Sequence, residues 1–235
     1  MKKLINDYKI KGFINFPLFT QKDHDIIYKF GIKWFYKNCN IKDNDIHKFP
    51  IEKYHIWSKK LKIDHNVICN AKNRYVYPAL KVSNIIKRGK KVKLFLKMLG
   101  FKDFKMFDDG WGFVGFRLMR PGFNDGYPLS KKDGGQAKNV VSCWFPIVGR
   151  GKNETIGFIP NSNNKKYSFY KPKNTKFTKD EYRLRNKKKL KDSIYNPSIK
   201  SNEVMIYTSA TLHTEQNSKL KNTRFNLEFR YQAID

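Results

Sequence analysis

The chain has 235 residues, a formal net charge of +29, and a composition that is 40% hydrophobic and 15% aromatic. This length suits one large domain or two small ones, and the apolar content excludes a globally disordered chain. No run of about 18 apolar residues is present, so we expect no transmembrane helix. The first residues turn polar at once and lack the apolar region of a signal peptide, so we expect a cytoplasmic protein.

The positive charge comes from 49 Lys and Arg residues against 20 Asp and Glu residues. A charge of this size favours a polyanionic partner such as a nucleic acid, an acidic polysaccharide or a membrane surface. The lysine-rich codon usage of an AT-rich genome is the alternative explanation, and it does not account for the small number of acids. Charge bears on association and leaves the fold open.

Cysteine and histidine spacing does not indicate a metal motif. The cysteines are odd in number and share no CxxC spacing, which argues against a disulfide framework or a zinc site; they are Cys39, Cys69 and Cys143. Three histidines are scattered over residues 40–66 at spacings that suit no metal motif, and we expect them to be surface or packing residues; they are His47, His55 and His65.

The N-terminal part predicts helices. Residues 8–19 read as a short strand, and Thr20-Gln21-Lys22-Asp23 fits a capping box, with Thr20 as N-cap. The following segment spaces its apolar residues for one helix face; they are Ile26, Ile27, Phe30, Trp34 and Phe35. Residues 83–99 predict a second, basic helix that Gly89 breaks or Gly100 ends.

From about residue 104 the pattern changes to short apolar or alternating runs bounded by Gly, Pro and Asn. The strand candidates are residues 113–119, 140–148, 155–159, 203–208 and 224–231. In the last of these, Phe225, Leu227 and Phe229 alternate with polar residues, which is the period of a half-buried strand. Helices followed by strands predict a mainly β protein of the α+β class. We expect residues 1–103 to be a helical support region in the same domain as a jelly-roll core, or double-stranded β-helix, over 104–235.

A polar insertion interrupts this core at residues 161–202. Residues 165–191 hold twelve Lys and Arg against two acids, Asp180 and Glu181. A loop of this length inside a compact domain is either functional or mobile. Two interpretations stay open: a solvated loop, or a lid over an anionic substrate that uses the aromatic residues of the segment.

Two segments point to chemistry. The first is Arg120-Pro121-Gly122-Phe123-Asn124-Asp125-Gly126-Tyr127-Pro128-Leu129, and the second is Leu212-His213 followed by Arg224 eleven residues later. Between them stand Trp144-Phe145-Pro146-Ile147 and residues 157–163, and Thr223-Arg224 opens a closing strand that runs on to Tyr231. Together these motifs resemble the phytanoyl-CoA dioxygenase-like family of the Fe(II)/2-oxoglutarate-dependent dioxygenase superfamily, over most of residues 108–231.

The resemblance implies a cupin-like site in which two His and one carboxylate hold iron, while a basic residue binds the distal carboxylate of 2-oxoglutarate. It implies that His213 is an iron ligand and that Arg224 binds 2-oxoglutarate. Arg117 or Arg120, on a predicted strand, would face the same pocket. The family's His-x-Asp motif is degenerate here, because Ser130 stands at the expected His and Lys132 at the expected Asp. A lysine ammonium has no lone pair with which to bind a metal.

Two alternatives follow from the altered motif. In one, Asp133 supplies the carboxylate through a one-residue shift that a bulge absorbs, with Glu215 or Ser130 as a further ligand. In the other, the metal is absent and Lys132, Arg117 and Arg224 form a pocket for an anion.

The first alternative predicts a dioxygenase that uses Fe(II) and 2-oxoglutarate to hydroxylate a small-molecule or saccharide-type substrate. The second predicts a binding module or non-redox enzyme without those cofactors, for an anionic small molecule or saccharide. Nucleic-acid binding through residues 165–191 ranks last, because no RNP, KH or helix-turn-helix signature is present. The oligomeric state does not follow from the sequence.

Overall fold

A computed structural model describes residues 2–108, 110, 112–125, 129–132, 140–170, 181–185, 187–215 and 219–234. For residues 130–132, 181–183, 187, 188 and 191 it describes the backbone without the side chain. Asp133 and the Gly134-Gly135 pair lie outside these residues, as do residues 171–180 of the basic segment. Within the described ranges no helix is both long and apolar enough to cross a membrane.

The chain forms helices first and most of its strands afterwards, as predicted. The α-helices are α1 (Lys2–Lys11), α2 (Gln21–Asn38), α3 (Tyr54–Lys60), α4 (His65–Cys69), α5 (Ala71–Arg74), α6 (Leu80–Arg88) and α7 (Lys90–Met98). The 3-10 helices are η1 (Asp43–Lys48), η2 (Ile51–Lys53), η4 (Ser162–Asn164) and η5 (Lys187–Ser193). The strands are β1 (Phe13–Phe16), β2 (Tyr75–Val76), β3 (Asp103–Met106), β4 (Val114–Met119), β5 (Ser130–Lys132), β6 (Val140–Val148), β7 (Gly157–Phe158), β8 (Phe169–Tyr170), β9 (Glu181–Leu184), β10 (Val204–Thr208), β11 (His213–Thr214) and β12 (Arg224–Ile234).

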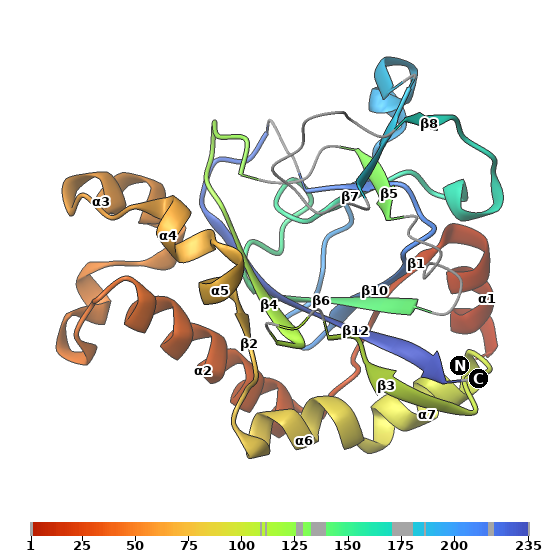
Figure 1. Ribbon diagram of the computed structural model, residues 1–235, viewed down its shortest axis with the longest axis horizontal. Helices are drawn as coiled ribbons and strands as arrows, with labels where there is room; N and C mark the ends of the chain where they lie inside the picture. Colours follow the sequence, from red (N-terminus) through yellow and green to blue (C-terminus); the bar gives the residue numbers. More distant parts are fainter. Residues whose placement is uncertain are drawn as a thin grey trace.

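Two antiparallel sheets form the β-core. The larger sheet has the strand order β1-β10-β6-β12-β4-β2, with β3 also pairing with β12, and the smaller sheet has the order β7-β11-β5-β9-β8. Figure 1 shows α2, α6 and α7 along one side of the larger sheet, while β5, β7 and β8 lie on its other side. The larger sheet is therefore the middle layer, between helices and the smaller sheet.

Strand β12 shows how the sequence assigns residues to these layers. Phe225, Leu227 and Phe229 are buried in the main hydrophobic core with the helices, and Trp34 of α2 stacks on the neighbouring Phe116 of β4 at 3.9 Å between ring centres. Because successive side chains in a strand point to opposite faces, the residues between them face the smaller sheet. The alternation read from the sequence thus separates a helix-facing apolar row from a polar row.

The helix predicted after the capping box is α2. The Thr20 hydroxyl accepts a hydrogen bond from the backbone N–H of Asp23 at 3.2 Å, and it donates to the Asp23 carboxylate at 2.8 Å. Gly31 lets this helix approach the sheet closely, since a Cβ there would lie 2.8 Å from Ile147 Cδ1. The predicted helix over residues 83–99 forms as two helices, α6 and α7, which meet at Gly89.

The strand predicted over residues 8–19 is partly wrong. Residues up to Lys11 form α1, and the strand is limited to Phe13–Phe16. Ile5 and Tyr8 are the buried residues of α1, a spacing of three that belongs to a helix. Gly12 ends the helix at a positive φ of 83°, and its backbone N–H donates to the Tyr8 carbonyl at 2.8 Å.

The polar insertion contains regular structure. Strands β8 and β9 pair with each other, and β9 continues the smaller sheet by pairing with β5. Leu184 of β9 is buried in a small apolar cluster with Leu129, Ile159 and Leu212. The described part of the insertion is therefore joined to the core through β9, and its role as a solvated loop or as a lid stays a prediction.

Candidate functional site between the sheets

The two sequence segments that predicted a site meet in the smaller sheet. Strand β11 begins at His213, whose Cα partner on β5 is Ser130 and whose partner on β7 is Phe158. Lys132, two residues further along β5, pairs with Glu181 of β9. The backbone therefore brings the position of the expected His-x-Asp motif beside His213.

His213 is buried, and its surroundings select one tautomer. Its Nδ1 lies 2.8 Å from the backbone carbonyl of Thr211. A carbonyl only accepts hydrogen bonds, so Nδ1 carries the proton and Nε2 carries the lone pair. The ring of Tyr207 lies at 5.0 Å between centres and that of Phe158 at 6.3 Å. This tautomer is the one that a ligand bound at Nε2 requires.

Arg224 begins β12 and is completely buried. Its Nη2 donates to the backbone carbonyl of Glu215 at 3.2 Å, and its guanidinium carbon lies 5.9 Å from the centre of the Trp144 ring. Gly149 makes room for the side chain, since a Cβ there would lie 2.9 Å from Arg224 Cγ. Arg224 Nε and Nη1 have no acceptor among the residues that the structure describes.

Burying the Nε and Nη1 donors of Arg224 without acceptors costs free energy of folding. A buried donor without a partner costs about 1–3 kcal/mol, and more when the group is charged. Burial lowers the pKa of Arg224, while the Glu215 and Glu228 carboxylates raise it. A guanidinium stays protonated in proteins, so its donors need acceptors instead of losing a proton. A ligand carboxylate accepts only, so it can pair with one of these donors and with the neighbouring Nη2.

Two carboxylates and a second arginine lie beside Arg224. Arg117 Nε donates to Glu228 Oε2 at 3.2 Å and lies 3.4 Å from Glu215 Oε1. Burial raises the pKa of Glu215, Arg117 lowers it and Glu228 raises it. With Asn226 and Trp144, these buried residues form what we call the inter-sheet cluster, which consists of Arg117, Trp144, Glu215, Arg224, Asn226 and Glu228.

The sequence predicted Arg117 as a pocket residue, and the structure gives it two carboxylate partners within the protein. Arg120, the alternative, lies in another cluster described below. Glu228 was not proposed for the site, although its place in the polar row of β12 was visible in the alternation. Lys132 was proposed as a ligand-binding residue, and its side chain lies outside the described part of the structure.

The inter-sheet cluster fits a carboxylate better than it fits iron. A carboxylate can accept from one of the unpaired donors of Arg224, Nε or Nη1, together with Nη2 on the same edge of the guanidinium. Within the described ranges, no three His, Cys, Asp or Glu side chains are grouped so that they can hold a metal ion. Of the candidate ligands, the structure describes His213 and Glu215, and Glu215 lies 3.4 Å from Arg117 Nε. Asp133 lies outside the described residues. The described donor set therefore does not form an iron site.

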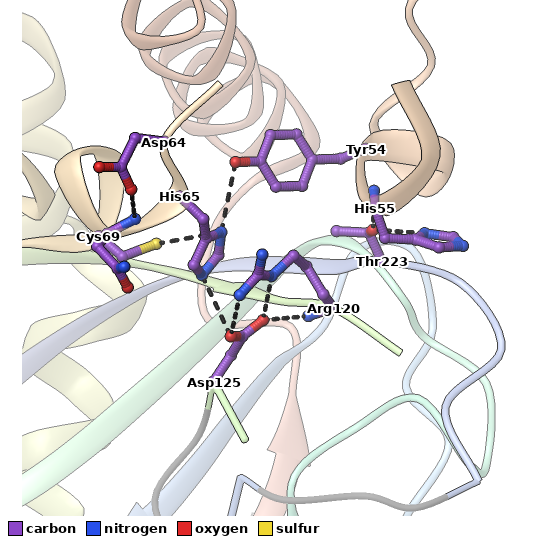
Figure 2. A network of polar contacts seen from close by, with 9 residues as sticks. Tyr54, His55, Asp64, His65, Cys69, Arg120, Asp125 and Thr223 are labelled. Carbon is purple, nitrogen blue, oxygen red and sulfur yellow. Dashed lines mark hydrogen bonds and ion pairs between the residues drawn. The ribbon is translucent and has the colours of Figure 1, made fainter. Parts of the chain in front are cut away.

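A second buried polar cluster lies where α3 and α4 meet the end of β4 (Figure 2). Arg120 Nε and Nη2 each donate to the Asp125 carboxylate at 2.8 Å, and the Arg120 backbone N–H donates to it at 2.8 Å. His65 Nε2 lies 3.5 Å from Asp125 Oδ1, and His65 Nδ1 lies 3.3 Å from the Tyr54 hydroxyl. We call Tyr54, His65, Arg120 and Asp125 the Asp125 clamp.

The clamp gives Asp125 and His65 structural roles. The Asp125 carboxylate ties the segment before β5 to the backbone at Arg120. His65 is a packing residue, as predicted, and burial lowers its pKa to about 4. The Cys69 sulfur lies 3.9 Å from His65 Nδ1, but burial raises the pKa of this thiol to about 12, which excludes a reactive thiolate near neutral pH.

Comparison with known proteins finds solved structures that share this fold. No protein-family model matches the chain, and no curated protein matches it in sequence. The solved structure of AviO1 from Streptomyces viridochromogenes Tue57 is similar with a TM-score of 0.58 and 10% identity, covering 100% of this chain and 96% of that one. EctD from S. alaskensis in its apoform is similar with a TM-score of 0.57 and 12% identity, covering 99% of this chain and 77% of that one.

A third similar structure holds ligands. The epimerase SnoN, in complex with Fe3+, alpha ketoglutarate and nogalamycin RO, matches with a TM-score of 0.54 and 8% identity, covering 99% of this chain and 83% of that one. The chain shares its fold with these three proteins. At such low identities the likeness concerns the fold and does not transfer their ligands or reactions.

Proposed function

We propose that this chain is a carboxylate-binding protein of the iron/2-oxoglutarate oxygenase superfamily, and that Arg224 binds the distal carboxylate of 2-oxoglutarate between the two sheets. The observation that supports this most strongly is the completely buried Arg224, whose Nε and Nη1 have no acceptor in the described part of the chain. It stands on the last long strand of a fold shared with an enzyme solved with alpha ketoglutarate.

The finer assignments belong to this proposal. The strand orders β10-β6-β12-β4 and β7-β11-β5 support a jelly roll, with β11 and β12 carrying His213 and Arg224. The phytanoyl-CoA dioxygenase-like family is proposed on the motifs of residues 108–231. Hydroxylation of a small-molecule or saccharide-type substrate is the corresponding activity, and it requires an iron site in which Asp133 joins His213.

The second candidate is a metal-free protein that binds an anion on the same fold. Lys132 at the expected Asp position favours it, because its ammonium adds a positive charge where iron would need a carboxylate. Both candidates share the binding of a carboxylate at Arg224. They differ in whether a divalent metal ion strengthens that binding and whether His213 is needed for it.

Anaerobic calorimetry with 2-oxoglutarate, with and without Mn(II) as a redox-silent substitute for Fe(II), tests the proposal. Arg224→Met should weaken binding at least about 30-fold, equivalent to about 2 kcal/mol, because two charged hydrogen bonds are lost. Arg150→Met is the matched control. Arg150 is a partly buried arginine that lies against α2: its Nη2 donates to the Pro146 carbonyl at 3.2 Å, and its guanidinium carbon lies 6.0 Å from the centre of the Tyr28 ring. Its Nε, like that of Arg224, has no acceptor among the described residues.

The metal and His213 arms separate the two candidates. Binding that needs Mn(II) and is lost in His213→Ala supports the oxygenase and makes Asp133 the next residue to test. Binding that is indifferent to Mn(II) and to a chelator supports the metal-free protein. If Arg224→Met binds 2-oxoglutarate as tightly as the wild type, both candidates are wrong about this arginine.

A further inference from the structure

Asn226 presents a buried amide that the carboxylate bound by Arg224 cannot satisfy. Asn226 is completely buried, and neither its Nδ2 nor its Oδ1 has a partner among the described residues. It stands two residues after Arg224 on β12, and its Cα partners are Arg117 on β4 and Pro146 on β6. Because side chains alternate along a strand, Asn226 faces the smaller sheet together with Arg224.

Trp144 adds another donor to the same region. Its Nε1 is buried and has no acceptor in the described ranges. Trp144 is the Cα partner of Glu228 on β12, and its ring centre lies 5.9 Å from the guanidinium carbon of Arg224. Beside the two donors of Arg224, the inter-sheet cluster thus contains two further unpaired donors, Trp144 Nε1 and Asn226 Nδ2, and one unpaired acceptor, Asn226 Oδ1.

The unpaired acceptor decides between ligand groups. A carboxylate or a keto oxygen only accepts hydrogen bonds, so either leaves Asn226 Oδ1 without a donor. An ammonium only donates, so it leaves Asn226 Nδ2 and Trp144 Nε1 without acceptors. A hydroxyl has one donor and two acceptor lone pairs. One hydroxyl can therefore satisfy Asn226 Oδ1, Asn226 Nδ2 and Trp144 Nε1 together.

We propose that the ligand of the inter-sheet cluster is a hydroxy carboxylate, whose carboxylate binds Arg224 and whose hydroxyl is bound by Asn226 and Trp144. This rests on the proposed function for its first contact, the carboxylate at Arg224, and adds the hydroxyl as the feature that decides selectivity. Alternate residues of a strand are about 7 Å apart, so the hydroxyl stands within a few bonds of the carboxylate. Sugar acids and short hydroxy dicarboxylates both have this arrangement.

Three five-carbon dicarboxylates that differ at one carbon provide the test. Glutarate has a methylene there, 2-oxoglutarate a keto group and 2-hydroxyglutarate a hydroxyl, which is one carbon from one carboxylate and three from the other. Their dissociation constants should be measured by calorimetry on the whole chain, with both enantiomers of the hydroxy acid. We expect one enantiomer of 2-hydroxyglutarate to bind at least about tenfold more tightly than the other two acids, because it alone pairs Asn226 Oδ1.

Variants separate the hydroxyl site from the carboxylate site. Asn226→Leu should reduce the preference for the hydroxy acid to about twofold or less while glutarate binding is retained, and Trp144→Phe should reduce it in part while it keeps an aromatic ring. Arg224→Met should weaken all three acids. If Asn226→Leu does not fold, the Trp144→Phe comparison tests the same hydroxyl contact.

The possible outcomes distinguish the hydroxyl contact at Asn226 and Trp144 from the carboxylate contact at Arg224. Equal binding of the three acids, unchanged in Asn226→Leu or Trp144→Phe, overturns the hydroxy-carboxylate proposal and leaves the role of Arg224 intact. Binding that does not respond to Arg224→Met overturns the proposed function itself. A preference for 2-oxoglutarate over the hydroxy acid also contradicts the hydroxyl contact.

Discussion

The Asp125 clamp holds a partly buried arginine, Arg120, beside one carboxylate, and the inter-sheet cluster holds a completely buried one, Arg224, near two. The two clusters differ in whether the arginine donors have acceptors. In the clamp, Arg120 makes two side-chain hydrogen bonds to one carboxylate at 2.8 Å. In the inter-sheet cluster, Arg224 makes one, to a backbone carbonyl, and its Nε and Nη1 are unpaired within the described structure. Buried polar groups in proteins are nearly always paired. The clamp meets this rule with its own residues, whereas the inter-sheet cluster leaves donors that the proposed ligand would pair.

This contrast agrees with the proposal that the inter-sheet cluster binds a ligand, and it predicts that the clamp contributes to stability. The clamp joins α3 and α4 to Arg120, after the end of β4, and to Asp125 in the segment before β5 (Figure 2). Satisfied buried networks stabilise a fold and fix its geometry, whereas a partly satisfied network is costly. The following experiments test that division, from the largest expected effect to the smallest.

Removing the shared carboxylate of the clamp should have the largest effect on stability. We expect Asp125→Leu to lower the free energy of unfolding by about 3–5 kcal/mol, because Arg120 loses its paired carboxylate in a buried setting. Urea denaturation followed by circular dichroism measures the change.

Asp45→Leu is the matched control for the clamp, since Asp45 also pairs with a basic residue, Lys48 at 2.7 Å, but on the surface. Surface ion pairs contribute little to stability, so the urea midpoint of this variant should match that of the wild type. Equal midpoints for the Asp45→Leu and Asp125→Leu variants would show that the clamp is not a stabilising network.

The clamp also predicts a pH dependence of stability. The pKa of His65 falls from 6.5 to about 4 on folding because the residue is buried. Between these values the unfolded chain binds the proton more readily, so stability rises with pH. The contribution is fully present above about pH 6.5 and is lost as pH falls towards 4, a total of about 3 kcal/mol at 1.36 kcal/mol per pKa unit.

Urea unfolding at pH 7.5 and pH 4.5 measures this contribution as the difference between the wild type and His65→Gln. Carboxylates titrate in both proteins, so the comparison isolates His65. We expect the wild type to lose about 2–3 kcal/mol more than His65→Gln on acidification, because the pKa of His65 falls to about 4 on folding. Parallel losses in the two proteins would contradict a neutral, buried His65.

The sequence predicts a cluster only where its residues lie close together along the chain or recur at a regular spacing. His213 and Arg224 are eleven residues apart on consecutive strands, and the polar row of β12 alternates with Phe225, Leu227 and Phe229. Both features lie within a short stretch of the chain, so they can be read from the sequence. The clamp has no such signal, because Tyr54 and His65 come from helices while Asp125 follows a strand about 60 residues later. Only tertiary packing brings them together.

The same reasoning explains the errors in the secondary structure. The capping box before α2 and the break at Gly89 are local signals, and both are confirmed. Helix α1 was missed because only Ile5 and Tyr8 are buried in a segment rich in lysine. Strand β9 was missed because its pairing partner, β5, lies about 50 residues earlier and the segment is dominated by charge.

Ligand binding should stabilise the protein through the inter-sheet cluster alone. At a concentration of 100 times its dissociation constant, a ligand adds about 2.7 kcal/mol to the free energy of unfolding. Thermal unfolding of the wild type with 2-hydroxyglutarate at that concentration should show a clear rise in Tm. The Arg224→Met variant should show none, and the Asp125→Leu variant, although less stable, should show a rise of similar free energy.

The smallest expected effect is that of Arg224→Met on the unliganded protein, which should change the free energy of unfolding by less than about 1 kcal/mol. The substitution removes one hydrogen bond, to the Glu215 carbonyl, and the attraction to two nearby carboxylates. It also removes two buried donors that have no acceptor in the described structure, and each such donor costs about 1–3 kcal/mol. Arg117 still pairs with Glu228 at 3.2 Å, so the remaining charges keep a partner.

Urea denaturation without ligand, run beside Asp125→Leu, checks this expectation. A loss of 3 kcal/mol or more would mean that Arg224 stabilises the fold as Asp125 does, and the distinction between a structural clamp and a ligand-binding cluster would not hold.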